Sequence, residues 1–347
     1  MKEPKRMELP REVWMGPDVL NEIPELCKRL SLKGKALVIA DKETLKVAGE
    51  KIIDFLTNEN YEVEKFLVEE AKMSTVNEVR ENINGESFLL GVGGGTCIDV
   101  AKFASFKENK SFISVPTAAS HDGISSSRAS IKGGGKSTSF QAQSPLAIVA
   151  DTLIIKNAPS RLLAAGCGDM ISNYTAVWDW EFAKREKNEV YSEYAAALSK
   201  MSSKLIMKNA ELISEGTEES ARKVVKALIS SGVAMSIAGS SRPASGSEHL
   251  FSHALDQIAP EPALHGEQCG VGSILMAHLQ ENDWKSIRNA LKKVGCPTNA
   301  KEMNIKPKHI IEALTKAHEI RKERYTILRN GIDKETAEEL ARKTGVI

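Results

Sequence analysis

The sequence lacks several features, and each absence excludes a class of protein. No apolar run in the 347 residues is long enough to cross a bilayer. Residues 1–6 lack the apolar core of a signal peptide. Neither sign of charge is in excess, because 47 Lys and Arg face 46 Asp and Glu, and the net charge of +1 gives no basis for nucleic-acid binding. We therefore expect a cytoplasmic protein that neither inserts into a membrane nor binds nucleic acid.

Closely spaced cysteines are absent as well. The five cysteines are spread along the chain with no C-x-x-C spacing. They are Cys27, Cys97, Cys167, Cys269 and Cys296. This scatter predicts reduced thiols rather than a disulfide framework, in agreement with a cytoplasmic location.

The chain changes character near residue 155. Before it, short apolar runs alternate with amphipathic helices, which predicts a parallel sheet covered by helices. The expected strands are 36–40, 61–68, 87–90, 112–115 and 145–149, the expected helices are 44–56 and 76–83, and a hairpin is expected within 125–150 around Gly133, Gly134 and Gly135. After it, the periodicity is almost wholly helical. These helices are expected at 191–213, 218–238, 286–294, 308–324 and 334–343.

These patterns predict two domains. Residues 1–157 would form an α/β, Rossmann-like dinucleotide-binding domain, and residues 158–347 an all-α metal- and substrate-binding domain. A ligand held by both would lie in the interdomain cleft, which is a usual place for an active site.

A glycine-rich turn is the most informative segment. Residues 91–102 read Gly-Val-Gly-Gly-Gly-Thr-Cys-Ile-Asp-Val-Ala-Lys, between a buried strand and a helix. Glycines let the backbone approach a phosphate, and a helix N-terminus favours its negative charge. The spacing matches neither G-x-G-x-x-G nor G-x-x-x-x-G-K-[ST], so a tight corner without a ligand is the alternative. A second loop, 114–127, is crowded with small hydroxyl residues that could bond a pyrophosphate or ribose, or simply form a surface turn.

A second group of residues suggests a metal site. His249 and His253 are four apart on one helix face, and His265 follows a Pro-rich loop. Asp169 stands beside glycines at the expected start of another helix. One Asp and two His are a plausible ligand set for catalytic Zn²⁺, although Fe²⁺ accepts the same ligands. The alternative is that the histidines are capping or interfacial residues.

The order of these motifs resembles the iron- and zinc-dependent polyol dehydrogenase superfamily, which includes glycerol dehydrogenase and 3-dehydroquinate synthase. The likeness runs from the glycine turn through Pro-Thr-Ala-Ala-Ser at 116–120 and Gly-Cys-Gly-Asp at 166–169 to Gly-Ser-Glu-His at 246–249 and His-Gly-Glu at 265–267. Within that superfamily, Ala-Ser-His-Asp-Gly-Ile-Ser-Ser at 119–126 and Arg-Ala-Ser-Ile at 128–131 look most like archaeal-type sn-glycerol-1-phosphate dehydrogenases.

The resemblance implies a role for each matching residue. Asp169, His249 and His265 would bind one divalent metal, taken as Zn²⁺, and Asp122, Asp169 and His253 would contact the substrate. Contacts to NAD or NADP are implied for Gly94, Gly95, Thr96, Cys97, Ile98, Asp99, Thr117, Ala118, Ala119, Ser120 and Ser126. Asp41, at a strand end, is a candidate for the adenosine ribose, and the neighbouring Lys42 leaves NAD versus NADP open.

The implied function is metal-dependent, NAD(P)H-linked reduction of dihydroxyacetone phosphate to sn-glycerol 1-phosphate for archaeal ether-lipid synthesis, by a homo-oligomer. Three alternatives remain at this stage. They are a polyol dehydrogenase acting on an unphosphorylated substrate, a dehydroquinate synthase-like enzyme, suggested by Gly134-Gly135-Lys136-Ser137, and a non-catalytic dinucleotide-binding regulator. Arg242 is a candidate for the substrate phosphate, but it could equally cap a helix or bridge the domains.

Overall fold

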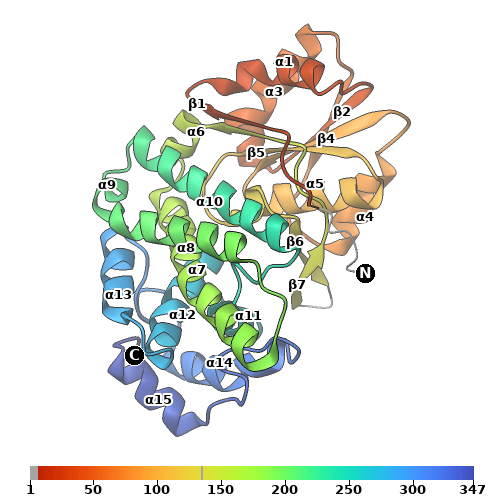
Figure 1. The fold of residues 1–347 in the computed structure, drawn as a ribbon. Coiled ribbons are helices and arrows are strands. Elements are labelled where there is room, and N and C mark those ends of the chain that lie inside the picture. Colours follow the sequence, from red (N-terminus) through yellow and green to blue (C-terminus); the bar gives the residue numbers. More distant parts are fainter. Residues whose placement is uncertain (1–6, 134–135) are drawn as a thin grey trace. The chain divides into compact units, whose positions relative to one another are not determined.

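The computed structural model describes residues 7–133 and 136–347, which divide into two compact units (Figure 1). The first unit contains residues 1–160 and 217–232, and the second contains 161–216 and 233–347. The sequence predicts a boundary after residue 157 and places everything beyond it in one domain. The return of 217–232 to the first unit depends on contacts between distant parts of the chain, which periodicity does not report.

A six-stranded parallel sheet forms the centre of the first unit. Its order is β1-β8-β5-β4-β2-β3. The strands are β1 (Glu12–Gly16), β2 (Lys35–Ala40), β3 (Val63–Leu67), β4 (Ser87–Gly93), β5 (Ser111–Pro116) and β8 (Ala147–Asp151). β2, β4 and β8 are buried at every residue, whereas the edge strands β1 and β3 are partly exposed. Strands buried on both faces read as continuous apolar runs, so the sequence indicates them clearly.

Helices pack on both faces of this sheet. The helical elements are η1 (Val19–Glu22), α1 (Ile23–Arg29), α2 (Lys42–Thr44), η2 (Leu45–Gly49), α3 (Glu50–Asn58), α4 (Met73–Glu81), α5 (Gly95–Lys107), η3 (Asp122–Ile124) and α6 (Thr152–Asn157). Alternate residues of β2, β4, β5 and β8 join one core with η1, α1, η2 and α3. On the other face α5 lies so close that a Cβ at Gly91 would be 3.0 Å from the Ala101 Cβ.

The hairpin expected within 125–150 is present. β6 (Arg128–Gly133) pairs antiparallel with β7 (Lys136–Gln141) as a separate two-stranded sheet, while Gly134 and Gly135 lie outside the described residues. The first part of α10 (Glu218–Ala238) packs on the preceding loop. Ser125 Oγ donates to the Leu228 carbonyl at 3.0 Å, and Ser231 Oγ donates to Asp122 Oδ2 at 2.8 Å. These bonds tie 217–232 to the first unit.

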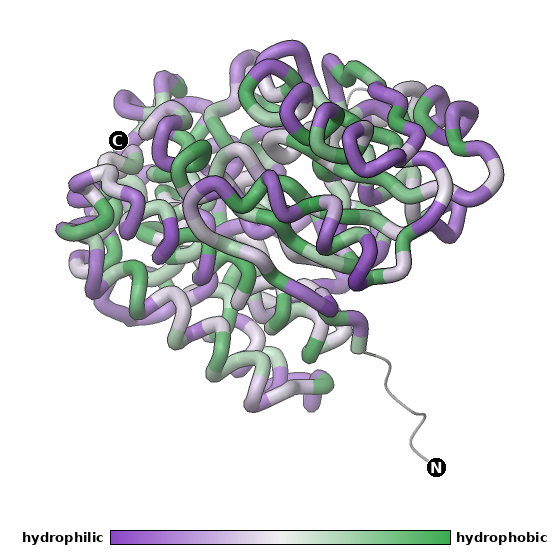
Figure 2. Tube along the Cα trace, turned by 90° about the horizontal axis from the view of Figure 1, so that it is seen from above, coloured by the Kyte–Doolittle hydropathy of each residue, from purple (hydrophilic) through white to green (hydrophobic). Residues whose placement is uncertain are grey.

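The described elements of the second unit are all helical, as predicted. They are α7 (Ser160–Lys187), α8 (Glu193–Lys208), α9 (Ala210–Ser214), the end of α10, α11 (Ser247–Ile258), α12 (His265–Leu279), α13 (Trp284–Lys293), α14 (Pro307–Ile320) and α15 (Lys334–Lys343). Figure 2 shows hydrophobic and hydrophilic residues alternating along the coils, as amphipathic helices require. No described helix is both long and apolar enough to span a membrane.

Two expected helices end elsewhere than predicted. The helix expected at 191–213 is interrupted at Asn209, where α8 gives way to the short α9. The helix expected at 308–324 ends at Ile320, because the next residue, Arg321, leaves the helical conformation with φ −142° and ψ 86°. Neither end carries a Gly or Pro, so the sequence gives no stop signal there.

Candidate functional site

The glycine turn lies where the sheet's strand order reverses. The chain runs from β2 outward to β3 and then returns to place β4 on the other side of β2. In open α/β sheets such a reversal leaves a crevice at the carboxyl ends of the strands, where ligands bind. The ends of β2 and β4 carry Asp41 and the segment Gly93–Gly95, and the Cys97 Sγ lies 3.6 Å from Asp41 Oδ2. The glycine turn therefore lies at the edge where such sheets bind ligands, and its contact with a cofactor stays a prediction.

Gly94 has no reason within the protein to be a glycine. Its φ of −85° suits any residue, and a Cβ built there has no neighbour within 4 Å. The two neighbouring positions do require glycine. Gly93 has φ +149°, and a Cβ at Gly95 would lie 2.3 Å from His121 Nε2. The open space over Gly94, at the start of α5, fits a backbone that a phosphate approaches.

Gly94→Val should therefore abolish NADH binding and leave the fold intact. The branched side chain would fill the open space without striking protein atoms. Calorimetric titration with NADH measures this. Gly133→Val is the matched control, because a Cβ there also meets nothing within 4 Å. NADH affinity equal to wild type in folded Gly94→Val would show that the turn is only a structural corner.

Other predicted cofactor residues are less accessible. Gly94, Gly95 and Thr96 are half-buried, whereas Cys97, Ile98 and Asp99 are buried. Asp99 Oδ1 lies 3.3 Å from Lys102 Nζ, and Oδ2 accepts from the Ser130 amide at 2.9 Å. Along the second loop, Thr117, Ala118, Ala119 and Ser126 are buried and Ser120 is half-buried.

Asp41 caps a helix. Its Oδ1 accepts hydrogen bonds from the amides of Glu43 at 2.9 Å and Thr44 at 2.8 Å, and Thr44 Oγ1 accepts from the Asp41 amide at 3.0 Å. This is a reciprocal capping box. The carboxylate thus has a structural task, and its expected contact with the adenosine ribose stays a prediction.

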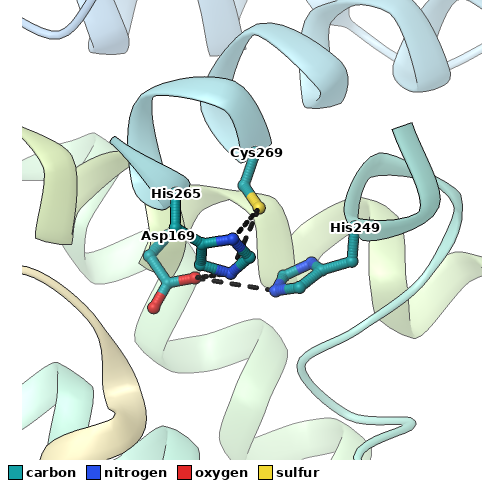
Figure 3. A group of neighbouring side chains, drawn as sticks. All are labelled: Asp169, His249, His265 and Cys269. Carbon is teal, nitrogen blue, oxygen red and sulfur yellow. Dashed lines mark hydrogen bonds and ion pairs between the residues drawn. The ribbon is translucent and has the colours of Figure 1, made fainter. Parts of the chain in front are cut away.

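The predicted metal ligands come together in the second unit (Figure 3). One ligand atom each from Asp169, His249, His265 and Cys269 lies within 4.8 Å of the others. Asp169 Oδ1 is 3.7 Å from His249 Nε2 and 3.8 Å from His265 Nε2. The Asp169 side chain is 3% exposed and that of His265 is 37% exposed. Three different helices, α7, α11 and α12, converge on a group that could hold a metal ion with one side accessible.

Asp169 does not lie at a helix start, and this corrects the sequence prediction. It stands in the middle of α7, ten residues into the helix. The glycine beside it, Gly168, instead allows α7 to cross α12 at close range. A Cβ at Gly168 would lie 2.2 Å from the Gly266 carbonyl oxygen, and a Cβ at Gly266 would lie 1.9 Å from the Ala165 carbonyl oxygen. The absence of both side chains lets α7 and α12 touch through their backbones, which places Asp169 beside His265.

Each of the two histidines predicted to bind the metal has a hydrogen-bond partner on its other ring nitrogen. Nδ1 of His249 lies 2.9 Å from Oε1 of the buried Glu248, and Nδ1 of His265 lies 3.1 Å from Ser252 Oγ. A hydrogen bond at Nδ1 orients the ring and leaves Nε2 free for a metal. Burial, followed by repulsion from His265 and His253, lowers the pKa of His249 well below its usual value. The ring is therefore held in the neutral form that metals bind.

A buried amide joins the histidines. Gln268 Nε2 donates to Ser252 Oγ at 3.1 Å and to Asp256 Oδ1 at 2.8 Å. Asp256 Oδ2 is in turn 3.7 Å from Nδ1 of His253, whose ring centroid lies 5.8 Å from that of His265. Burial lowers the pKa of His253, while its interaction with the accepting carboxylate of Asp256 opposes the change. His253 thus belongs to the same cluster, as its spacing from His249 predicts.

Arg242 is paired within the protein through Nε and one terminal nitrogen, while its buried Nη1 has no hydrogen-bond partner among the described residues. Its guanidinium makes a two-pronged ion pair with Glu189, with Nε 2.6 Å from Oε1, and donates to the Tyr325 carbonyl at 2.9 Å. The pair neutralises the charge that would attract a substrate phosphate.

Sequence reasoning missed the partners Glu248, Ser252 and Gln268, and it missed Cys269 as a member of the cluster. The positions of Ser252 and Cys269, one helical turn or less from His249, His253 and His265, were the available signal.

Comparison with known proteins places the chain in a family. Residues 14–159 match the family model described as iron-containing alcohol dehydrogenase. The fold resembles that of glycerol dehydrogenase from Schizosaccharomyces pombe, with a TM-score of 0.84 at 21% identity over 99% of this chain and 91% of that one. It also resembles sulfoacetaldehyde reductase from Bifidobacterium kashiwanohense in complex with NAD⁺, with a TM-score of 0.76 at 16% identity over 99% of both chains.

Curated relatives are much more similar in sequence. Glycerol-1-phosphate dehydrogenase [NAD(P)+] of Methanothermobacter thermautotrophicus is 56% identical over 99% of this chain and 100% of its own length. That of Thermococcus sibiricus is 58% identical over 98% of both. Because the identity extends over nearly the whole length of both partners, the chain belongs to the glycerol-1-phosphate dehydrogenase family of iron-containing alcohol dehydrogenases.

Proposed function

We propose that this protein reduces dihydroxyacetone phosphate to sn-glycerol 1-phosphate with NADH or NADPH, and so supplies glycerophosphate backbones for archaeal ether lipids. The observation that carries the proposal is the 56–58% identity, along nearly the whole chain, to relatives named for this activity. Two features support it as well. They are the acid–histidine cluster, which consists of Asp169, His249, His253 and His265, and the open glycine turn at Gly94.

The donor set fits a catalytic divalent metal, which we take to be Zn²⁺. Asp169, His249 and His265 would hold it, since one carboxylate and two neutral imidazoles within 4.8 Å match the ligands of catalytic zinc. When bound, the metal supplies a Lewis acid for the ketone oxygen, and the nicotinamide supplies the hydride. The Glu248 carboxylate would accept from Nδ1 of His249 and leave Nε2 for the metal, and Ser252 lies beside Nδ1 of His265 and would help to orient that ring.

His253 is the protonatable group one helical turn from His249. Asp256 lies beside its Nδ1 and would orient the ring. The imidazole would donate a proton to the oxygen of the reduced ketone, directly or through water. Asp169 and His253 would contact the substrate from the second unit. The matching assignment of Asp122 rests on the family resemblance, and so does assembly into a homo-oligomer.

The direct test is an assay with purified protein, dihydroxyacetone phosphate and either NADH or NADPH. We expect oxidation of the nicotinamide and a product that a stereospecific sn-glycerol-3-phosphate dehydrogenase does not consume. A product consumed by that enzyme would contradict the proposed stereochemistry.

Cys269→Ser should retain one metal per chain. Cys269 Sγ lies 3.6 Å from His265 Nε2, close enough to be considered a fourth ligand. Four protein ligands would close a tetrahedral site, whereas catalysis needs an open position. Metal analysis after dialysis measures this, with Cys167→Ser as the control, since that thiol is also buried but outside the cluster. Loss of metal from the Cys269 variant alone would identify a closed, structural site.

A further inference from the structure

Three arginines, Arg242, Arg321 and Arg324, gather near the start of α11, where Glu189, Glu248 and Asp179 are the nearby carboxylates. Arg324 donates to the Ser245 carbonyl at 2.5 Å and to Ser241 Oγ at 2.9 Å, both just before α11. Burial, then the charges of Arg321 and Arg242, lower the pKa of Arg324 to about 9. Within residues 7–133 and 136–347, Arg242 is the one of these three arginines that has an ion-pair partner, Glu189.

Arg321 is the exceptional member of this group. Its side chain is half-buried, yet within the described residues its guanidinium takes part in no hydrogen bond, ion pair or ring contact. Burial lowers the pKa of Arg321, and the charge of Glu323 opposes this with a smaller effect. Its guanidinium has therefore lost part of its hydration, and no described residue replaces the lost hydrogen bonds. An anion that binds there would replace them.

The position of Arg321 connects it with the histidines. It follows the last residue of α14, and α14 packs along α11, which carries His249 and His253. The segment after it is fixed to the first turn of α11, by the Arg324 bonds and by Asp179. Asp179 accepts from the Ile327 amide at 2.8 Å and from the Ser247 amide at 2.7 Å. The charge of Arg321 also contributes to lowering the pKa of both His249 and His253.

We infer that Arg321, supported by Arg324, binds the phosphate of the phosphorylated ketone substrate. The inference rests on the proposed function and adds the anion subsite to it. Arg321 offers a free planar fork that matches phosphate oxygens, while Arg324 adds a second positive charge and is itself anchored to the backbone before α11. The acid–histidine cluster would then face the ketone end of a small substrate while the phosphate end meets the arginines.

Arg321→Ala should lower the ratio of kcat/KM for dihydroxyacetone phosphate over dihydroxyacetone by roughly 10²-fold, mainly through KM for the phosphorylated ketone. The inhibition constant of inorganic phosphate against dihydroxyacetone phosphate should rise in parallel, and Arg321→Lys should recover part of both. Metal content and melting temperature should match wild type. Lys322→Ala is the control, because it removes one positive charge from an exposed neighbour and should leave the ratio unchanged.

The outcomes separate this inference from the proposed function. A wild-type preference for dihydroxyacetone phosphate that persists in folded Arg321→Ala would overturn the inference alone. Equal losses on both ketones would also overturn it, since Arg321 would then act on the shared chemistry. A rise confined to the KM of NADPH would place a cofactor phosphate there instead. If the wild-type enzyme showed no preference for dihydroxyacetone phosphate over dihydroxyacetone, the proposed function itself would be contradicted.

Discussion

Dihydroxyacetone phosphate should be reduced at least ~10³-fold more efficiently than dihydroxyacetone, measured as kcat/KM. Loss of several charge-assisted hydrogen bonds to the phosphate, each contributing about 1.5–3 kcal/mol, accounts for a factor of this size. Binding energy remote from the reacting carbon also helps to position the ketone at the metal and the nicotinamide. The phosphate therefore acts on the rate as well as on the affinity.

The experiment compares the two ketones at a fixed saturating concentration of NADPH. The control is glycerol as the substrate in the oxidative direction with NADP⁺, since a polyol dehydrogenase would oxidise it readily. Comparable rates on the phosphorylated and unphosphorylated ketones would indicate a polyol dehydrogenase instead.

His265→Ala should lose both the metal and the activity. The change removes one of three ligands, and we expect metal affinity to fall by more than ~10²-fold. This loss exceeds the one expected when only a hydrogen-bond partner of a ligand is removed. Loss of the Lewis acid should then lower kcat by roughly 10³-fold. Metal content after dialysis and turnover with dihydroxyacetone phosphate measure the two effects.

The matched control is His278→Ala, because His278 also lies on α12 but packs its ring against Trp284, away from the acid–histidine cluster. It should keep full metal content. Full metal occupancy in His265→Ala, or full activity of the wild-type enzyme after exhaustive chelation, would rule out the proposed metal site.

The sequence predicts those parts of the fold whose burial is uniform. The strand around residues 36–40 is a continuous apolar run, and that around 112–115 is interrupted by Ser114 alone, because helices cover both faces of the sheet. β1 was not predicted, since this edge strand mixes exposed and buried residues in Glu-Val-Trp-Met-Gly. Periodicity also overran the ends of α8 and α14, where no Gly or Pro marks the stop.

The candidate site also contains residues that the sequence predicts and residues that it does not. The types and spacing of Asp169, His249 and His265 suffice to identify a ligand set, and the structure brings these residues together. Residues that act through tertiary contacts could not be predicted. The environment of Glu248 depends on Thr175 Oγ1, 2.8 Å away and 73 positions earlier in the chain. Arg321 looked like one more residue on an amphipathic helix, because its lack of a partner is a property of the folded chain.

The glycine crossing between α7 and α12 limits how this enzyme could be re-engineered or could diverge. An added Cβ at Gly168 or Gly266 would strike a backbone carbonyl of the opposite helix, and no substitution removes a carbonyl. A substitution of either glycine therefore cannot be compensated by changing a side chain elsewhere. We expect each glycine to resist substitution by itself, so that the two positions do not co-vary. Selection for a different metal preference must accordingly act on the ligands and their hydrogen-bond partners, because the spacing of these two helices offers no adjustable side chain.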